Sequence, residues 1–170
     1  MEISTIEMEV AIMDYFDSRK NLIVPGITNM MNLVPFETDV LLITPSNCAY
    51  GFEIKISKAD LKADFKKRHH SYRIEKGDDL CIEKYYRKFR HFYYVVPEFL
   101  KEIAVELIPE FCGLMCLHKS GNKLQEVKPA KVLSKYNWSD KEKYEVARLG
   151  SMRIHTLKRN IIALRNKNKP

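Results

Sequence analysis

The spacing of apolar residues near the start of the chain predicts an amphipathic helix. Apolar side chains recur every three or four positions from Ile3 to Phe16, and Ser4 or Thr5 can cap the first turn. We therefore expect a helix over about residues 4–19. The sequence Val24-Pro25-Gly26 follows it and is expected to end this unit or to turn the chain.

Two stretches in the next part of the chain favour a β-hairpin. Residues 40–43 form a short apolar run, and residues 50–56 alternate between apolar and polar positions. Pro45-Ser46-Asn47 lies between them and favours a turn. We expect the two strands to pair with each other.

The rest of the chain alternates between helical and extended patterns. Ser57, with Asp60 three positions later, is typical of a capping box and predicts a helix from Ala59 to about His69. The further elements expected are a loop over 71–79, a short helix over 80–89, a strand over 92–96, a hairpin of 114–117 with 124–127 around a turn at 119–122, and a basic helix over about 141–165 with a frayed tail over 166–170. This order predicts one α/β or α+β domain over residues 1–165, with a mixed central β-sheet flanked by helices.

Composition adds a preference for a polyanionic partner. The chain has 170 residues, of which 45% are hydrophobic, enough for one domain with its own core. Its formal net charge of +7 favours an anionic partner such as nucleic acid. The N-terminal residues lack the features of a secretory signal, and no apolar run reaches the roughly 18 residues of a membrane span. We therefore expect a cytoplasmic protein with no membrane partner.

The four cysteines are expected to be reduced residues rather than disulfides in a protein of this kind. Cys112, Cys116 and His118 raise the alternative of a zinc site. In an extended strand, however, these three side chains would be spread over about 20 Å. One tetrahedral ion cannot bind ligands so far apart.

Three charged residues on the predicted hairpin form a candidate catalytic site. Glu53 and Lys55 are two positions apart in a strand, so they project from the same face, while Phe52 and Ile54 point the other way. Asp39 opens the preceding strand, and in a hairpin the start of one strand lies beside the end of the next. Asp39 can therefore meet Glu53 and Lys55. The alternative is a surface ion pair between Glu53 and a lysine, which would contribute little.

This combination of residues suits a hard divalent cation. Mg²⁺ (or Mn²⁺) takes oxygen ligands, which Asp39, Glu53 and the backbone carbonyl of Ile54 could supply. Such an ion polarises a phosphodiester and activates a bound water, and Lys55 would orient that water or offset developing negative charge. Glu9, inside the apolar stripe of the first helix, is a further candidate catalytic residue and is preferred over Glu7. Glu37 ranks below both.

Basic residues follow the candidate site directly. Residues 55–90 contain twelve lysines and arginines against six acidic residues. Lys62, Lys66, Lys67 and Arg68 could hold a phosphate backbone near the ion, and His70 could join them. The alternative is a solvated helix face. Adjacent His69 and His70 point about 100° apart on a helix, so we expect them at the surface rather than on one ion.

At these residues the sequence resembles a known superfamily. Asp39 followed by Glu53-Ile54-Lys55, after an acidic N-terminal helix, is similar to the PD-(D/E)XK, or restriction-endonuclease-like, superfamily. The block from Glu53 to Lys67, with Phe92 to Glu98, Ile108 to Glu110 and Gly113-Leu114, resembles its MmcB-like group of DNA-repair-associated and phage-borne proteins. Thr38 stands where the motif has proline, and the stretch from about Ser71 to Arg87 is longer than expected for the group.

The resemblance implies a restriction-endonuclease-like core, Mg²⁺ held by Asp39 and Glu53, and Lys55 as the catalytic lysine. The expected function is a metal-dependent deoxyribonuclease acting in DNA repair or phage DNA processing. A nucleic-acid-binding module that keeps this fold but does not cleave alone is the alternative. The sequence leaves open the polarity and strandedness of the DNA substrate. A homodimer is compatible with the sequence, which does not show one.

Overall fold

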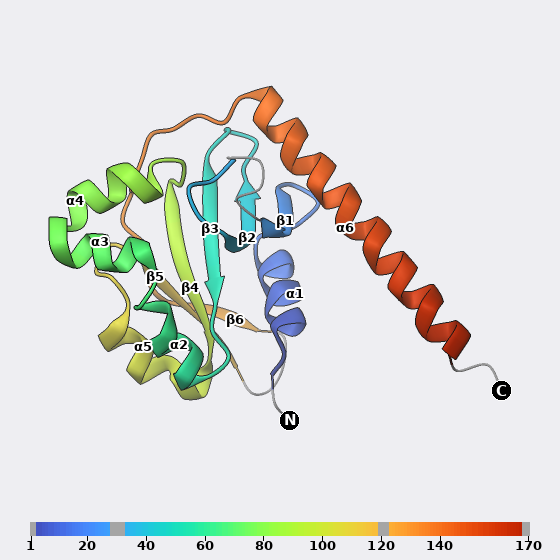
Figure 1. Cartoon of the computed structure of the whole chain (residues 1–170), viewed down its shortest axis with the longest axis horizontal. Coiled ribbons are helices and arrows are strands. Elements are labelled where there is room, and N and C mark those ends of the chain that lie inside the picture. The colour runs from blue at the N-terminus through green and yellow to red at the C-terminus, as the bar shows by residue number, and fades with distance from the viewer. Residues whose placement is uncertain (1–2, 28–32, 119–122, 168–170) are drawn as a thin grey trace.

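The computed structural model describes residues 3–27, 33–118 and 123–167. Its helices lie around a central β-sheet, as Figure 1 shows. The helices are α1 (Thr5–Tyr15), α2 (Lys58–Asp64), α3 (Arg68–Lys76), α4 (Asp78–Cys81), the π-helical segment Ile82–Tyr86, the 3₁₀ turn Glu98–Leu100, α5 (Lys101–Leu107) and α6 (Asp140–Lys167). The strands are β1 (Leu22–Ile27), β2 (Thr38–Ile43), β3 (Ala49–Ile54), β4 (His91–Pro97), β5 (Gly113–Leu117) and β6 (Leu124–Lys128).

The six strands form one mixed sheet in the order β1-β2-β3-β4-β5-β6. β1, β2 and β3 are successively antiparallel, β4 and β5 run parallel to β3, and β6 is antiparallel to β5. The expected mixed sheet flanked by helices is therefore confirmed. Both expected hairpins, β2 with β3 and β5 with β6, are also present, although the turn at 119–122 lies outside the described residues.

Helix α1 begins where the sequence predicts. The Ser4 hydroxyl accepts a hydrogen bond from the Glu7 N–H (3.3 Å), and the Glu7 carboxylate accepts one from the Ser4 N–H (2.7 Å), which completes a capping box. The helix ends at Tyr15, earlier than expected, and Asp17 takes a left-handed conformation with φ of 51°. That conformation turns the chain towards β1.

The expected turn at Val24-Pro25-Gly26 is wrong, because these residues lie inside β1. Pro25 has no N–H to donate, but among the described strands β1 lies at the edge of the sheet and pairs only with β2. Gly26 adopts a φ of 64°, which a glycine reaches without steric cost. A strand at the edge of the sheet can therefore contain a sequence that is typical of turns.

The helical region after β3 also differs from expectation. The single helix expected over 59–69 is divided into α2 and α3, because Lys67 has an extended backbone (φ −66°, ψ 152°). The loop expected over 71–79 is wrong, since α3 continues to Lys76 and Gly77, with φ of 90°, ends it. Helix α5 was not expected from the sequence. The seven residues of α5, between Pro97 and Pro109, form a helical pattern too short to be distinguished from a loop in the sequence.

Two apolar cores cover the two faces of the sheet. Helix α1 packs Met8, Ala11 and Ile12 onto one face, against residues such as Val40 and Phe52. Helices α2 to α5 cover the other face, where aromatic side chains fill much of the core. The aromatic residues of this core include Tyr85, Tyr86, Phe89, Phe92, Tyr94, Phe111 and Trp138. Three of the four cysteines, Cys81, Cys112 and Cys116, are buried, and all four are free thiols.

Helix α6 confirms the expected basic helix, although only its first half is packed. Val146 is buried in the core beside β1, and Arg153 donates a hydrogen bond to the Gly26 carbonyl (2.6 Å). Every residue from Ser151 to Lys167 is exposed, and this half runs away from the sheet (Figure 1). Across the described ranges, no helix combines the length and apolar character needed to span a membrane.

Candidate functional site

The predicted meeting of Asp39, Glu53 and Lys55 is found in the structure. Val40 pairs with Phe52 in the β2–β3 hairpin, so the register, continued by one residue, sets Asp39 opposite Glu53. All three side chains line one cleft of about 260 Å³. The other residues around this cleft are Thr5, Glu37, Ile54, Asp60 and Lys67.

Asp39 is held in place by the neighbouring strand. Its Oδ2 atom accepts a hydrogen bond of 2.7 Å from the backbone N–H of Ile54. The preceding Thr38 is fully buried and donates its hydroxyl to the Phe52 carbonyl (3.1 Å). Thr38 thus bonds across the hairpin and fixes the backbone next to Asp39. Ile54 lines the cleft and orients Asp39 through its N–H.

Glu53 belongs to a ring of four alternating charges. Its Oε1 atom lies 2.8 Å from the Lys55 ammonium and 2.6 Å from that of Lys67. The same two ammoniums lie 3.0 Å and 2.5 Å from Oδ1 of Asp64. The Lys55 side chain is only 6% exposed, whereas that of Lys67 is 45% exposed. Lys55 is therefore a fixed member of the ring, and Lys67 is the member that can leave towards solvent.

The cleft is acidic in an otherwise basic chain. Four carboxylates (Glu37, Asp39, Glu53, Asp60) and two lysine ammoniums line it, so its formal charge is −2. Burial, together with the adjacent Asp39, raises the pKa of Glu53 to about 7, although Lys55 opposes the shift. Burial likewise raises the pKa of Asp39, against the Ile54 N–H and Lys55. The two neighbouring carboxyl groups repel each other when both are ionised, so a cation bound between them would be favourable.

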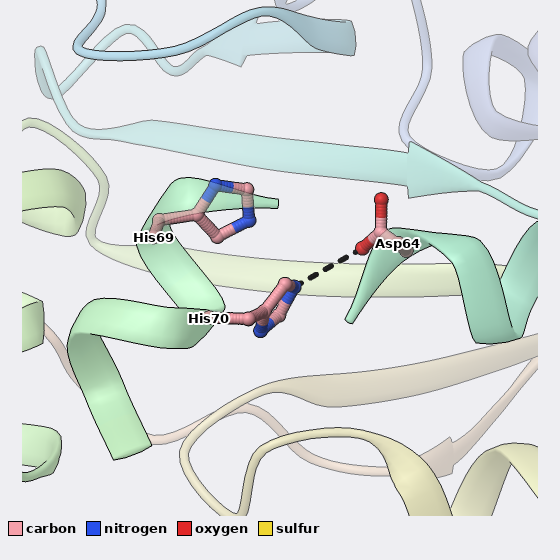
Figure 2. A group of neighbouring side chains, drawn as sticks. All are labelled: Asp64, His69 and His70. Carbon is pink, nitrogen blue, oxygen red and sulfur yellow. Dashed lines mark hydrogen bonds and ion pairs between the residues drawn. The ribbon is translucent and has the colours of Figure 1, made fainter. Parts of the chain in front are cut away.

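Asp64 anchors this ring to the core. Its Oδ2 atom accepts a hydrogen bond from the Tyr94 hydroxyl (2.7 Å) and lies 3.1 Å from Nε2 of His70, as Figure 2 shows for the histidine. The Tyr94 hydroxyl lies 2.9 Å from the same nitrogen. Burial alone would raise the pKa of Asp64, but bonds from His70, Lys67 and Tyr94 hold it well below its usual range. Asp64 is thus a buried anion that contacts both lysines and keeps the buried Lys55 in place.

The expected surface position of His69 and His70 is wrong. His70 is 1% exposed and His69 is 6% exposed, so His70 is not placed to contact DNA. The helix expected to run to about His69 breaks at Lys67, and α3 begins there with both histidines turned towards the core. His69 stacks on Phe36, with ring centroids 4.6 Å apart. Burial, and then His70, lowers the pKa of His69 to about 3, which keeps this ring neutral.

Asp64, His69 and His70 bring ligand-type atoms within 4.8 Å of one another (Figure 2). Their surroundings suit a hydrogen-bond network better than a metal centre. A divalent cation there would lie beside Asp64, which already contacts two ammoniums at 2.5 and 3.0 Å. The two ammoniums would repel the cation at close range. The acidic cleft around Asp39 and Glu53 has the donor set that a hard cation prefers.

The N-terminal helix presents Glu9, not Glu7, towards this region. Glu7 is used in the capping box with Ser4. Glu9 is half-buried, and burial followed by the nearby negative charge of Asp39 raises its pKa. Glu9 does not itself line the cleft, whereas Thr5, one turn earlier, does. The preference for Glu9 over Glu7 agrees with this raised pKa. The apolar stripe on which the preference was based is not the buried face of α1, since Ile6 and Val10 are 69% and 49% exposed.

The basic residues proposed for nucleic acid divide into two groups. Lys62, Lys66 and Arg68 are exposed on α2 and at the start of α3. Lys67 is instead part of the charge ring.

Sequence reasoning missed Asp60 and Asp64 as site residues. Asp64 could have been found, because it follows the buried Leu61 by three positions and so shares its inward face on α2.

Comparisons with known proteins show the fold but no function. No protein-family model matches the chain, and no curated protein matches it. Among solved structures, the SPO1766 protein of unknown function from Silicibacter pomeroyi is similar over 100% of this chain and 98% of its own. The TM-score is 0.56 and the sequence identity is 15%. The chain therefore shares an α/β fold, a mixed sheet flanked by helices, with a protein of unknown function.

Proposed function

We propose that this protein is a metal-dependent nuclease that hydrolyses phosphodiester bonds of DNA, on a restriction-endonuclease-like core. The observation that carries the proposal is the acidic cleft. Asp39 and Glu53 meet there, Lys55 is fixed beside them, and the formal charge is −2 in a chain of net charge +7. A charge of this sign next to a phosphate backbone is unfavourable unless a cation fills the cleft.

The residues present fit Mg²⁺ or Mn²⁺. Asp39 and Glu53 would hold the ion, with the Ile54 carbonyl as a further oxygen ligand. When bound, such an ion supplies a Lewis acid for the phosphodiester and lowers the pKa of a bound water. The Ile54 N–H keeps Asp39 oriented, and Asp64 keeps Lys55 in place. Lys55 would orient the attacking water and offset charge that develops on the phosphate.

DNA as the substrate is supported by the surface next to the cleft. Lys62, Lys66 and Arg68 are exposed on the α2–α3 segment that follows β3. Lysine and arginine there can neutralise phosphates and hold the backbone over the cleft without reading sequence. Lys67, 45% exposed at the rim, is the connection between this surface and the carboxylates.

A cleavage assay tests the proposal. Purified protein is incubated with plasmid and with single-stranded DNA, in Mn²⁺, in Mg²⁺ or with chelator. We expect cleavage only with the metal, and a loss of at least about 100-fold in Asp39→Asn and in Lys55→Met. Asp39→Asn preserves side-chain size and removes a negative charge, so with chelator its DNA affinity should stay equal to that of wild type or increase. Weaker DNA binding by this variant with chelator would contradict an acidic cleft that repels phosphate in the absence of a cation.

A second function, DNA binding without cleavage, is favoured by one observation. Both lysines of the charge ring already contact the Glu53 carboxylate, which partly satisfies its negative charge. If these contacts persist in the presence of metal, the fold binds DNA through its basic residues alone. Salt-sensitive DNA binding that is unchanged by chelator, with no cleavage on either substrate, would select this second function.

A further inference from the structure

The exposed half of α6 has a regular apolar seam. Ile154, Leu157, Ile161 and Leu164 follow one another at intervals of three, four and three residues, and each is 49–60% exposed. This is the spacing of core positions in paired helices, with isoleucine and leucine alternating. The seam continues the face of α6 that packs Val146 against the sheet. Past Gly150 this face has no cover in the described structure, so a further element is needed to bury it.

Basic residues border this seam on both sides. At about 100° per residue, Lys158 and Arg165 fall on one side of it, and Arg153 and Lys167 on the other. Residues 151–167 contain five lysines and arginines and no acidic residue. Pairing α6 with a second α6 would therefore bring like charges together on both borders, which is unfavourable. The complementary surface is an apolar helix face with acidic borders.

Helix α1 presents such a face. Ile6 and Val10 are 69% and 49% exposed, and Met13 continues their line on the side opposite the core. Glu7 and Asp14 border this line on one side and Glu9 on the other. Helix α1 contains three acidic residues and no lysine or arginine. Its length of about 16 Å matches the roughly 15 Å from Ile154 to Leu164.

The two faces do not cover each other within one chain. α1 and α6 are neighbours where Glu9 and Arg153 interact electrostatically. Beyond Arg153, α6 runs straight on and diverges from α1 (Figure 1). Both apolar faces are consequently exposed in the same molecule. A second copy can supply the missing partner for each of them.

We propose that the chain forms a two-fold dimer in which the exposed half of α6 of each copy packs on α1 of the other. The two contacts are identical, so the assembly is closed. Each buries an apolar seam against an apolar face and sets basic borders against acidic ones. The dimer does not depend on the nuclease proposal.

Light scattering after size-exclusion chromatography tests the dimer with the full chain. We expect twice the 20.0 kDa mass of one chain at about 50 µM protein. Val10→Glu on α1, and the double change Leu157→Glu with Ile161→Glu on α6, should each raise the dissociation constant at least tenfold. The matched control is Ile74→Glu, since Ile74 is 75% exposed on α3 and should leave the dimer intact. Circular dichroism verifies that each variant keeps its fold.

A charge-exchange experiment separates this arrangement from α6 pairing with α6. Asp14→Lys alone, and Lys158→Glu with Arg165→Glu in another chain, should each weaken the dimer. Mixing these two variants should restore much of the dimer, because one of the two contacts is then wild type and the other sets the Asp14→Lys change against the glutamates on α6. A wild-type monomer at all concentrations overturns the proposal. The proposal is also overturned if the α6 changes break the dimer but Val10→Glu and Asp14→Lys leave it intact.

Discussion

At Glu53, two lysine ammoniums compete with any divalent cation for one carboxylate. Lys55 is buried and bound to Asp64, which is held in turn by Tyr94 and His70. Lys67 reaches the same oxygen from the rim and is nearly half-exposed. Removing Lys67 therefore takes away a competing charge with little effect on packing. We expect the metal to displace Lys67 rather than Lys55.

The change Lys67→Met tests this competition at the residue scale. The variant should bind Mn²⁺ more tightly than wild type, by at least about threefold, because one positive charge within 3 Å of Glu53 is lost. Isothermal titration calorimetry measures the affinity. Lys66→Met is the matched control, since Lys66 is exposed and forms no ion pair in the described structure. Equal affinity in both variants would show that Lys67 does not oppose the metal.

The raised pKa of Glu53 predicts a pH dependence of metal binding. A carboxyl group with a pKa of about 7 is mostly protonated at pH 6 and mostly ionised at pH 8. Metal binding must displace the proton, so the Mn²⁺ affinity should be about tenfold weaker at pH 6 than at pH 8. A constant affinity across this range would mean that Glu53 is ionised throughout.

At the scale of elements, the β2–β3 hairpin could be predicted because its signals are local. Alternation in residues 50–56 determines which side chains share a face, and the turn between the strands determines their register. The positions of Asp64 and Lys67, the other two members of the charge ring, depend on tertiary contacts. Nothing in the sequence around Lys67 indicates the backbone break that separates α2 from α3. Without that break, His69 and His70 are assigned to the surface, although they lie in the core.

The N-cap of α2 links this element to the site. The Ser57 hydroxyl accepts a hydrogen bond from the Asp60 N–H (3.1 Å), and α2 carries both Asp60 and Asp64. Ser57→Ala should lower the free energy of unfolding by about 1 kcal/mol. Urea denaturation measures the change. Ser71→Ala is the control, because Ser71 is an exposed residue inside α3 and its loss should change stability by less than about 0.5 kcal/mol.

At the scale of the whole molecule, charge is distributed unevenly. The chain carries a net charge of +7, while the cleft has a formal charge of −2. Basic residues on α2 and α3 lie directly after the strand that bears Glu53. The net charge could be calculated from the sequence, but the acidic cleft could not be predicted from it. Asp60 lines the cleft only because of the position that α2 takes in the folded chain.

This distribution predicts the salt dependence of DNA binding. The combined change of Lys62, Lys66 and Arg68 to glutamine should weaken DNA binding regardless of sequence. It should also reduce the slope of log affinity against log salt by about 0.9 for each phosphate contact that is lost. Fluorescence anisotropy at several salt concentrations measures the slope. An unchanged slope would place the DNA on another surface, such as the basic second half of α6.

In the proposed nuclease site, Asp39 and Glu53 share one divalent cation. A crystal structure of the protein soaked in Mn²⁺, with anomalous diffraction data, shows whether they do. We predict an anomalous peak about 2 Å from a carboxylate oxygen of each residue, with the Lys67 ammonium withdrawn from Glu53. A peak at Asp64, His69 and His70 instead, or no peak in the cleft at saturating Mn²⁺, would contradict the account.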